Sequence, residues 1–204
     1  MNTGKYHILL LLILVSVWFS YSQNPPERVF YFADTAKSKV YWKCDIHRGY
    51  FGLRYGGLLL EDGIPVGGAF VIPTGSFTDT DIDRKNFDTA YMIFHNTIKN
   101  EFLEIERYPY AYFIIERITP TEGQRYSIQG NLTLHGVTRP VVFNAGILVD
   151  EGMLTLTGDP LVIDRSEWGI LRLSPKNPEP DDENGWTVPD EVEISVRITA
   201  VIQQ

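Results

Sequence analysis

The chain has 204 residues, of which 44% are hydrophobic and 13% aromatic, and its formal net charge is −8. This share of apolar and aromatic residues can bury a core, which excludes collagen-like, low-complexity and wholly disordered chains. The acidic balance argues against a nucleic-acid-binding protein, because such proteins need clustered Lys and Arg to displace counterions from phosphates. A single cysteine, Cys44, excludes an intrachain disulfide framework.

The N-terminal segment, residues 1–22, carries the features of a secretory signal peptide. Lys5 precedes an unbroken apolar run from Ile8 to Val15, and Ser20-Tyr21-Ser22 places small residues as they occur at a signal-peptidase site. The apolar run is shorter than the ~20 residues of a comfortable membrane span, although a retained N-terminal anchor stays as the alternative. We therefore predict cleavage before Gln23, export, no stable membrane span after cleavage, and a single domain over residues 23–204.

Apolar and polar residues alternate with a period of two through most of the remaining sequence, which is the pattern of half-buried β-strands. The cleanest alternation runs from Val192 to Ile202, and the same period occurs from Val40 to His47 and from Tyr126 to His135. Cys44 falls on the apolar face of its strand, so we interpret it as a small buried hydrophobe and not as a reactive thiol. Further strands are predicted over residues 29–33, 50–60, 68–72, 110–118, 141–149 and 153–156.

One segment breaks this period. Between Thr89 and Glu106 the apolar residues fall at spacings that suit a short helix or two helical turns, and Tyr108-Pro109 ends it. The proline-rich and acidic stretch Pro175–Asp190 is interpreted as a solvated loop. Many short antiparallel strands must hide their edges, so we predict an all-β fold: a closed barrel of roughly eight strands, with a two-sheet sandwich as the alternative.

The sequence offers no strong motif for a metal centre. Asp79, Asp81 and Asp83 resemble the start of a calcium loop, but Arg84 and Ala90 stand where that loop needs glycine and glutamate. We therefore interpret this segment as a solvated turn.

The histidines and the possible catalytic residues also form no recognisable motif. His47, His95 and His135 share no ligand spacing with one another or with Cys44, so each is interpreted as a surface or gate residue, and no metal or cofactor is predicted. The chain has neither a Gly-x-Ser-x-Gly elbow nor a Ser-x-x-Lys motif, and we assign no catalytic residues.

The positive signal is apolar and distributed along the strands. Large apolar side chains occupy positions predicted to face inward, and periodicity alone leaves open whether they fill a barrel or line a cavity. These positions are Trp42, Phe70, Phe94, Phe102, Phe113, Leu132, Leu134 and Trp168.

A resemblance to a known family favours a barrel with a cavity over a filled barrel. The stretch Gly130–Val141, with the sequence GNLTLHGVTRPV, closely resembles the signature strand of the YceI-like, polyisoprenoid-binding family. Three further segments resemble motifs of that family in the same order along the chain. They are Glu101–Phe113, Ile163–Ile170 and Val188–Ala200.

The resemblance implies a lipocalin-like, eight-stranded antiparallel barrel with a short helical segment. It also implies export to the periplasm and an elongated apolar cavity that holds an isoprenoid or another amphiphilic lipid without a metal. Trp42 stands where many members carry a smaller Phe, and the acidic loop looks longer than usual. The predicted ligand-binding residues are Trp42, Phe70, Ile72, Phe102, Phe113, Leu132, Leu134, His135 and Arg139.

Three of the polar residues in these motifs have two interpretations. His135, Arg139 and Arg165 are candidates for a polar mouth of the cavity, and pairing with surface carboxylates is the alternative for each. Two other functions also stay open: an exported barrel enzyme that acts on an amphiphile, and an interaction module with a filled barrel. The sequence leaves the oligomeric state open, including a homodimer, and predicts a periplasmic or secreted location.

Overall fold

The computed structural model describes residues 25–82, 85–86, 88–177 and 185–202. The predicted signal peptide therefore lies outside the described residues, as does Asp83. Within the described ranges, no helix combines the length and the apolar character that crossing a membrane would require.

The described chain consists mainly of β-strands. The strands are β1 (Arg28–Ala33), β2 (Lys39–Cys44), β3 (His47–Gly52), β4 (Tyr55–Glu61), β5 (Ile64–Pro73), β6 (Thr78–Asp79), β7 (Tyr110–Pro120), β8 (Arg125–Leu134), β9 (Val137–Asp150), β10 (Met153–Gly158), β11 (Leu161–Asp164) and β12 (Glu191–Ile202). The helical elements are the turn η2 (Thr74–Ser76), the helix α2 (Asp88–Thr97), the π-helical turn η3 (Ile98–Phe102) and the 3-10 turn η4 (Arg165–Trp168).

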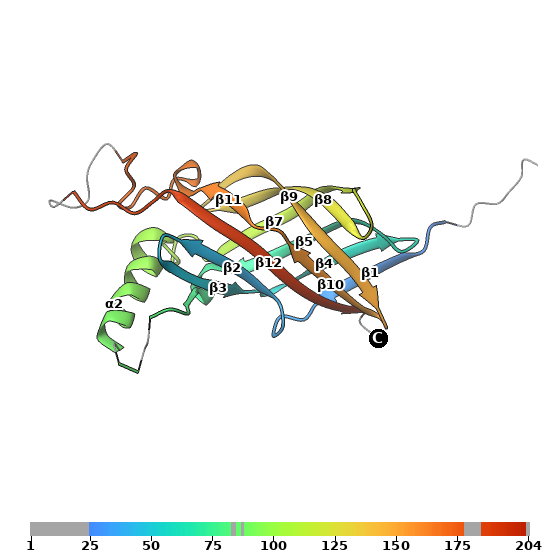
Figure 1. Cartoon of the computed structure of the whole chain (residues 1–204), viewed down its shortest axis with the longest axis horizontal. Coiled ribbons are helices and arrows are strands. Elements are labelled where there is room, and N and C mark those ends of the chain that lie inside the picture. Colours follow the sequence, from blue (N-terminus) through green and yellow to red (C-terminus); the bar gives the residue numbers. More distant parts are fainter. Residues whose placement is uncertain (1–24, 83–84, 87, 178–184, 203–204) are drawn as a thin grey trace, which may run out of the picture.

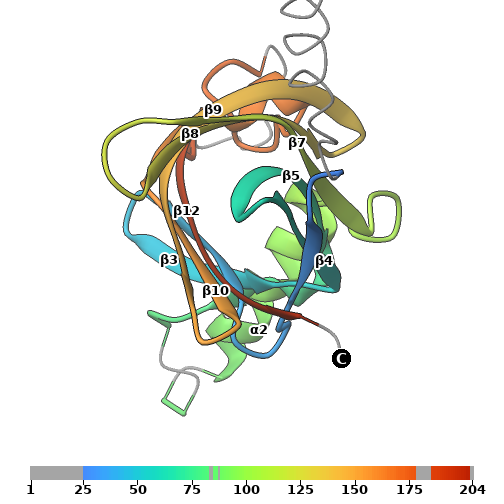
Figure 2. The ribbon, with the colours of Figure 1, turned by 90° about the vertical axis from the view of Figure 1, so that its right-hand side faces the viewer.

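Eight of the strands form a closed antiparallel barrel. They follow the order β1-β4-β5-β7-β8-β9-β10-β12, and β12 pairs back to β1 through Tyr31↔Ile202 and Ala33↔Ala200 (Figure 2). β2, β3 and β6 continue the sheet beyond β12, which also pairs with β11. The predicted barrel is thus confirmed, and the sandwich alternative is wrong because the hydrogen-bonded circuit closes.

One end of the barrel interior is packed solid. Alternate residues point inward as the period of two predicts, so that Leu154 and Leu156 on β10 are buried whereas Met153 is exposed. The small side chains of two alanines let larger aliphatic groups meet at the centre. The residues of this packed end are Leu58, Ile128, Ala145, Leu154 and Ala200, all with 0% exposure and all in one cluster.

The helix α2 lies at the other end of the barrel (Figure 1). Together with η3 it occupies the segment predicted to be helical. The turn between β2 and β3 reaches the same end, because His47 packs against Phe94 of α2 with ring centroids 4.6 Å apart.

Two long strands predicted from the sequence are each interrupted. The alternation from Val40 to His47 belongs to a hairpin, in which Trp42 pairs with Gly49 and the chain turns at Asp45 and Ile46. Ile46 is therefore 72% exposed and does not face inward. The predicted strand 50–60 likewise breaks between β3 and β4. The alternation of apolar and polar residues does not reveal either break, because the residues in the two turns continue the same pattern.

Truncation of a side chain in the packed end should destabilise the barrel. We expect Leu154→Ala to lower the free energy of unfolding by about 2–5 kcal/mol, because the close-packed neighbours leave a void. Leu148→Ala on β9, where the side chain is 47% exposed, should cost about 0.5 kcal/mol or less. Urea denaturation followed by circular dichroism measures both, and equal losses for the two variants would contradict a solid packed end.

Candidate functional site: an apolar cavity in the barrel

A cavity of about 550 Å³ occupies the part of the barrel next to α2. Its volume lies within the ~300–1,000 Å³ range of small-molecule sites. Several residues line the cavity and also belong to the cluster that fills the packed end. Leu156 and Ile198, each 2% exposed, are the most deeply buried of them, so we place the floor there. The barrel is therefore hollow on one side of these residues and solid on the other.

The cavity wall consists mainly of apolar side chains. Phe70 on β5 pairs with Phe113 on β7, which pairs with Leu132 on β8. Residues directly opposite each other on paired strands share a face, so these side chains form one row across the wall. Gly130 makes room for this row, because a Cβ there would lie 2.6 Å from the Phe113 ring.

Seven of the predicted ligand-binding residues lie on this wall. They are Trp42, Phe70, Ile72, Phe102, Phe113, Leu132 and Leu134. Their contact with a ligand stays a prediction. Phe77 also lines the cavity but was not predicted from the sequence, and its ring stacks on Trp42 with centroids 4.9 Å apart and an interplanar angle of 21°. Phe77 follows the short turn η2, where no period exists to indicate its orientation.

The mouth of the cavity is formed by three separate segments. The β2–β3 turn contributes Ile46 and His47, α2 contributes Phe94 and Thr97, and the segment before β12 contributes Trp186. Trp186 and Ile46 are the most solvent-accessible of these, at 74% and 72% exposure. Beneath the mouth most lining residues are apolar, and Asp159, Arg165 and Ser195 also line the cavity.

His135 and Arg139 lie outside the cavity wall. His135 and Gly136 form the turn between β8 and β9, both with positive φ, and the His135 Nε2 lies 2.9 Å from Glu104 Oε1. Arg139 Nε donates to the carbonyl of Glu167 at 2.6 Å on the outer surface. The alternative, pairing with surface carboxylates, describes both residues, because Arg139 Nη1 also lies 3.9 Å from Glu167 Oε2. Their contact with a ligand stays a prediction.

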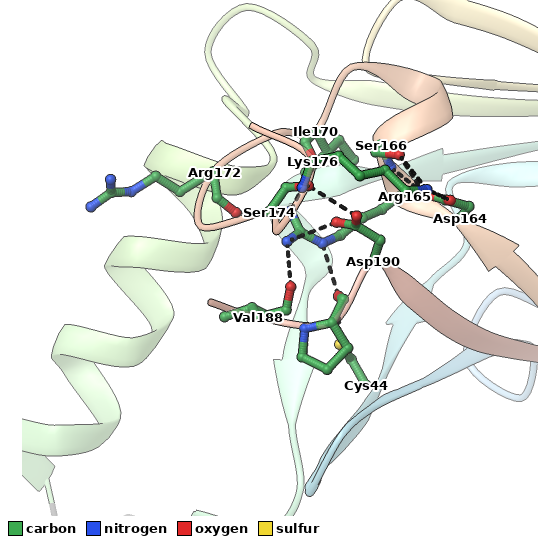
Figure 3. Close-up of polar contacts among 11 residues, drawn as sticks. Cys44, Asp164, Arg165, Ser166, Ile170, Arg172, Ser174, Lys176, Val188 and Asp190 are labelled. Carbon is green, nitrogen blue, oxygen red and sulfur yellow. Dashed lines mark hydrogen bonds and ion pairs between the residues drawn. The ribbon is translucent and has the colours of Figure 1, made fainter. Parts of the chain in front are cut away.

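Arg165 is the centre of a buried polar cluster beside the cavity (Figure 3). Its residue exposure is 4%, and its guanidinium forms an ion pair with Asp190 at 3.3 Å. The same guanidinium donates to four backbone carbonyls, those of Ile170, Arg172, Val188 and Pro189, at 2.8–3.1 Å.

Four of the five N–H groups of Arg165 thus donate to backbone carbonyls, and Nη2 also forms the ion pair with Asp190 Oδ1. Arg165 pairs with a buried carboxylate and not with a surface one, which corrects that interpretation. Arg165 also lines the cavity, and its contact with a ligand headgroup stays a prediction. Asp190 is 6% exposed and accepts from Ser174 Oγ at 2.9 Å, which also corrects its assignment to a solvated loop. Residues 178–184 of that loop lie outside the described residues.

Cys44 lies half-buried on the cavity wall next to this cluster. Its Sγ donates to the carbonyl of Pro189 at 3.6 Å. Burial raises the pKa of the Cys44 thiol above its ordinary value, although the nearby charge of Arg165 acts in the opposite direction. A raised pKa keeps the thiol protonated near neutral pH, which agrees with the sequence interpretation that it is not reactive.

Two further sequence interpretations are wrong. Asp79 does not lie in a solvated turn, since its side chain is fully buried, while Asp81 beside it is partly exposed. His95 is 8% exposed and stacks on Tyr91 in α2, so its interpretation as a surface residue is wrong, and a gate role stays a prediction. Asp79 became buried because β6 pairs with β3, a contact that the local sequence does not encode.

The model of the YceI-like domain matches residues 31–200. The chain belongs to the YceI-like domain family.

Relatives of known structure share the fold. The crystal structure of BcnA from Burkholderia cenocepacia is 20% identical, with a TM-score of 0.60, and the alignment covers 83% of this chain and 99% of BcnA. A polyisoprenoid binding domain from Saccharophagus degradans is 12% identical, with a TM-score of 0.59, over 86% of this chain and 99% of that domain. At identities of 20% and 12%, this structural similarity establishes the fold alone.

Curated relatives match a shorter segment. A UPF0312 protein of Pseudomonas putida is 42% identical over 45 residues, which are 22% of this chain and 23% of that protein. The match thus spans about a quarter of the curated relative's length.

Removal of the Arg165 side chain should destabilise the protein strongly. Arg165→Ala leaves the Asp190 carboxylate and four carbonyls without their donor, so we expect the free energy of unfolding to fall by about 3–5 kcal/mol. Arg139→Ala removes an exposed arginine and should cost about 1 kcal/mol or less. Chemical denaturation of the two variants gives the comparison, and a small loss for Arg165→Ala would refute its structural role.

Proposed function

We propose that this protein binds and carries an isoprenoid, or an amphiphilic lipid of similar shape, in the barrel cavity. The observation that carries the proposal is the combination of an apolar wall, a closed floor and an open mouth. Such a cavity suits a molecule with one long apolar end and one polar end. The polyisoprenoid-binding domain of S. degradans shares the fold, which supports an isoprenoid as the first ligand to test.

The energetics favour a tail-first orientation. Each methylene transferred from water into an apolar site contributes about 0.8 kcal/mol, so burial of the tail supplies most of the affinity. Few directed contacts are needed for this, and we expect the wall to select a lipid by length and width more than by headgroup chemistry. The headgroup then remains at the mouth, near His47 and Thr97.

We propose binding and not catalysis as the activity. The residues that line the cavity are mainly aliphatic and aromatic, and the guanidinium of Arg165 donates to four backbone carbonyls of the protein. The rival of a filled-barrel interaction module conflicts with the observed cavity. The signal-peptide features of residues 1–22 support action after export, in the periplasm or outside the cell.

The proposal can be tested with a charged side chain placed on the cavity wall. We expect Leu132→Arg to abolish lipid binding, because a buried arginine without a partner is strongly disfavoured next to an apolar tail. Gln129→Arg on the same strand β8 is the matched control, since residue 129 is exposed on the opposite face of the sheet. Protein purified from the exported fraction is extracted with organic solvent, and the extract is analysed by mass spectrometry.

Wild-type protein and Gln129→Arg should both release an isoprenoid or quinone-like lipid, whereas folded Leu132→Arg should release none. Circular dichroism establishes that each variant is folded. The proposal fails if wild-type protein carries no lipid and takes none up, or if folded Leu132→Arg carries as much as the control.

A further inference from the structure

Three side chains with metal-binding atoms meet beside the mouth of the cavity, and one of them, His47, lines it. His47 is the first residue of β3, Asp79 is the last residue of β6, and Asp81 follows two residues later. His47 Nδ1 lies 3.8 Å from Asp79 Oδ2 and 3.3 Å from Asp81 Oδ2. All three residues offer a ligand atom within 4.8 Å of the others.

The Asp79 carboxylate is buried with one oxygen unsatisfied. Its side chain has 0% exposure, and its Oδ1 accepts from the amides of Asp81 and Ile82 at 3.2 and 2.8 Å. Its Oδ2, which is directed at the His47 ring, has no hydrogen-bond partner among the described residues, and neither has His47 Nδ1. A buried carboxylate oxygen without a partner is costly, so a cation beside it would stabilise this arrangement.

The local fold holds these groups in place. Gly49 pairs with Asp79 and Tyr50 with Thr78 across the β3–β6 ladder. This close approach requires glycine, since a Cβ at residue 49 would lie 1.8 Å from the Thr78 carbonyl oxygen.

Two more contacts fix the orientation of the ligand atoms. Asp81 Oδ1 accepts from the Arg48 amide at 3.1 Å, which leaves its Oδ2 directed at His47. The His47 ring packs against Phe94 of α2. The three ligands are therefore arranged before any ion binds, which reduces the cost of assembling a site.

The spacing and the chemistry of the three groups agree with a shared ion. Nitrogen and oxygen ligands lie about 2.0–2.2 Å from Zn²⁺ in a tetrahedral site, which places neighbouring ligand atoms about 3–4 Å apart. Imidazole selects first-row transition metals over Ca²⁺ and Mg²⁺, and two carboxylates offset the charge of a divalent ion.

We propose that His47, Asp79 and Asp81 bind a divalent transition-metal ion of the Zn²⁺ type beside the mouth of the cavity. Three protein ligands leave a coordination position for water or for a ligand oxygen, as in open zinc sites. The spacing of the aspartates along the sequence could not show this site, because the histidine comes from a different hairpin.

The test is a calorimetric titration with ZnCl₂ of the untagged, chelator-treated protein that comprises residues 23–204. We expect one Zn²⁺ per chain in the wild-type protein and an affinity at least tenfold weaker in His47→Gln and in Asp79→Asn. Asp62→Asn is the matched control, because it makes the same chemical change in the exposed β4–β5 turn and should bind Zn²⁺ like the wild type.

Thermal unfolding gives a second readout. Zn²⁺ should raise the Tm of wild-type protein and of Asp62→Asn by several degrees and leave His47→Gln unchanged. The His47 side chain is 34% exposed at the rim, so the His47→Gln variant is expected to fold. Absence of Zn²⁺ binding in wild-type protein, or binding that His47→Gln does not weaken, would overturn the proposal.

Discussion

The pairing of β12 with both β1 and β10 is the interaction on which the rest of the structure depends. It closes the barrel, so the backbone groups of these strands find their partners within the sheet and no edge remains between β1 and β10. Closure removes the need for polar groups inside the barrel. The interior can then be apolar along its whole length, whether side chains fill it or not.

The two parts of the interior use this freedom differently. Near Ala200 the barrel is filled by small and aliphatic residues that pack to zero exposure, and this end supplies stability. Toward α2 the wall residues are larger but stand apart around the cavity. A chain with one cysteine has no internal disulfide that could stabilise this open end. Hydrogen bonds from Arg165 instead connect η4 to the segments on both sides of residues 178–184.

Sequence periodicity predicted the fold better than the site. The alternation on β8 and β12 correctly assigned inward faces, and the need to hide strand edges favoured a barrel. Periodicity states which face a residue occupies and not how deep it lies. Ile128 and Leu134 both point inward from β8, yet Ile128 is part of the packed end and Leu134 lines the cavity.

The polar residues were the hardest to place from the sequence. Arg165 looked like a ligand contact within its motif, but its partners are carbonyls up to 24 residues away. Asp79 meets His47 only because β6 pairs with β3. Such positions depend on long-range pairing, which a single sequence does not reveal.

The dependence of affinity on lipid length tests the central claim most directly. A series of isoprenoid alcohols of increasing length, titrated against the purified protein by fluorescence of its tryptophans, gives one dissociation constant for each length. With a floor at Leu156 and Ile198, affinity should rise with each added unit and then stop rising once the tail reaches the floor. Affinity that does not change from the shortest alcohol to the longest would contradict a hollow, closed-ended barrel as the binding site.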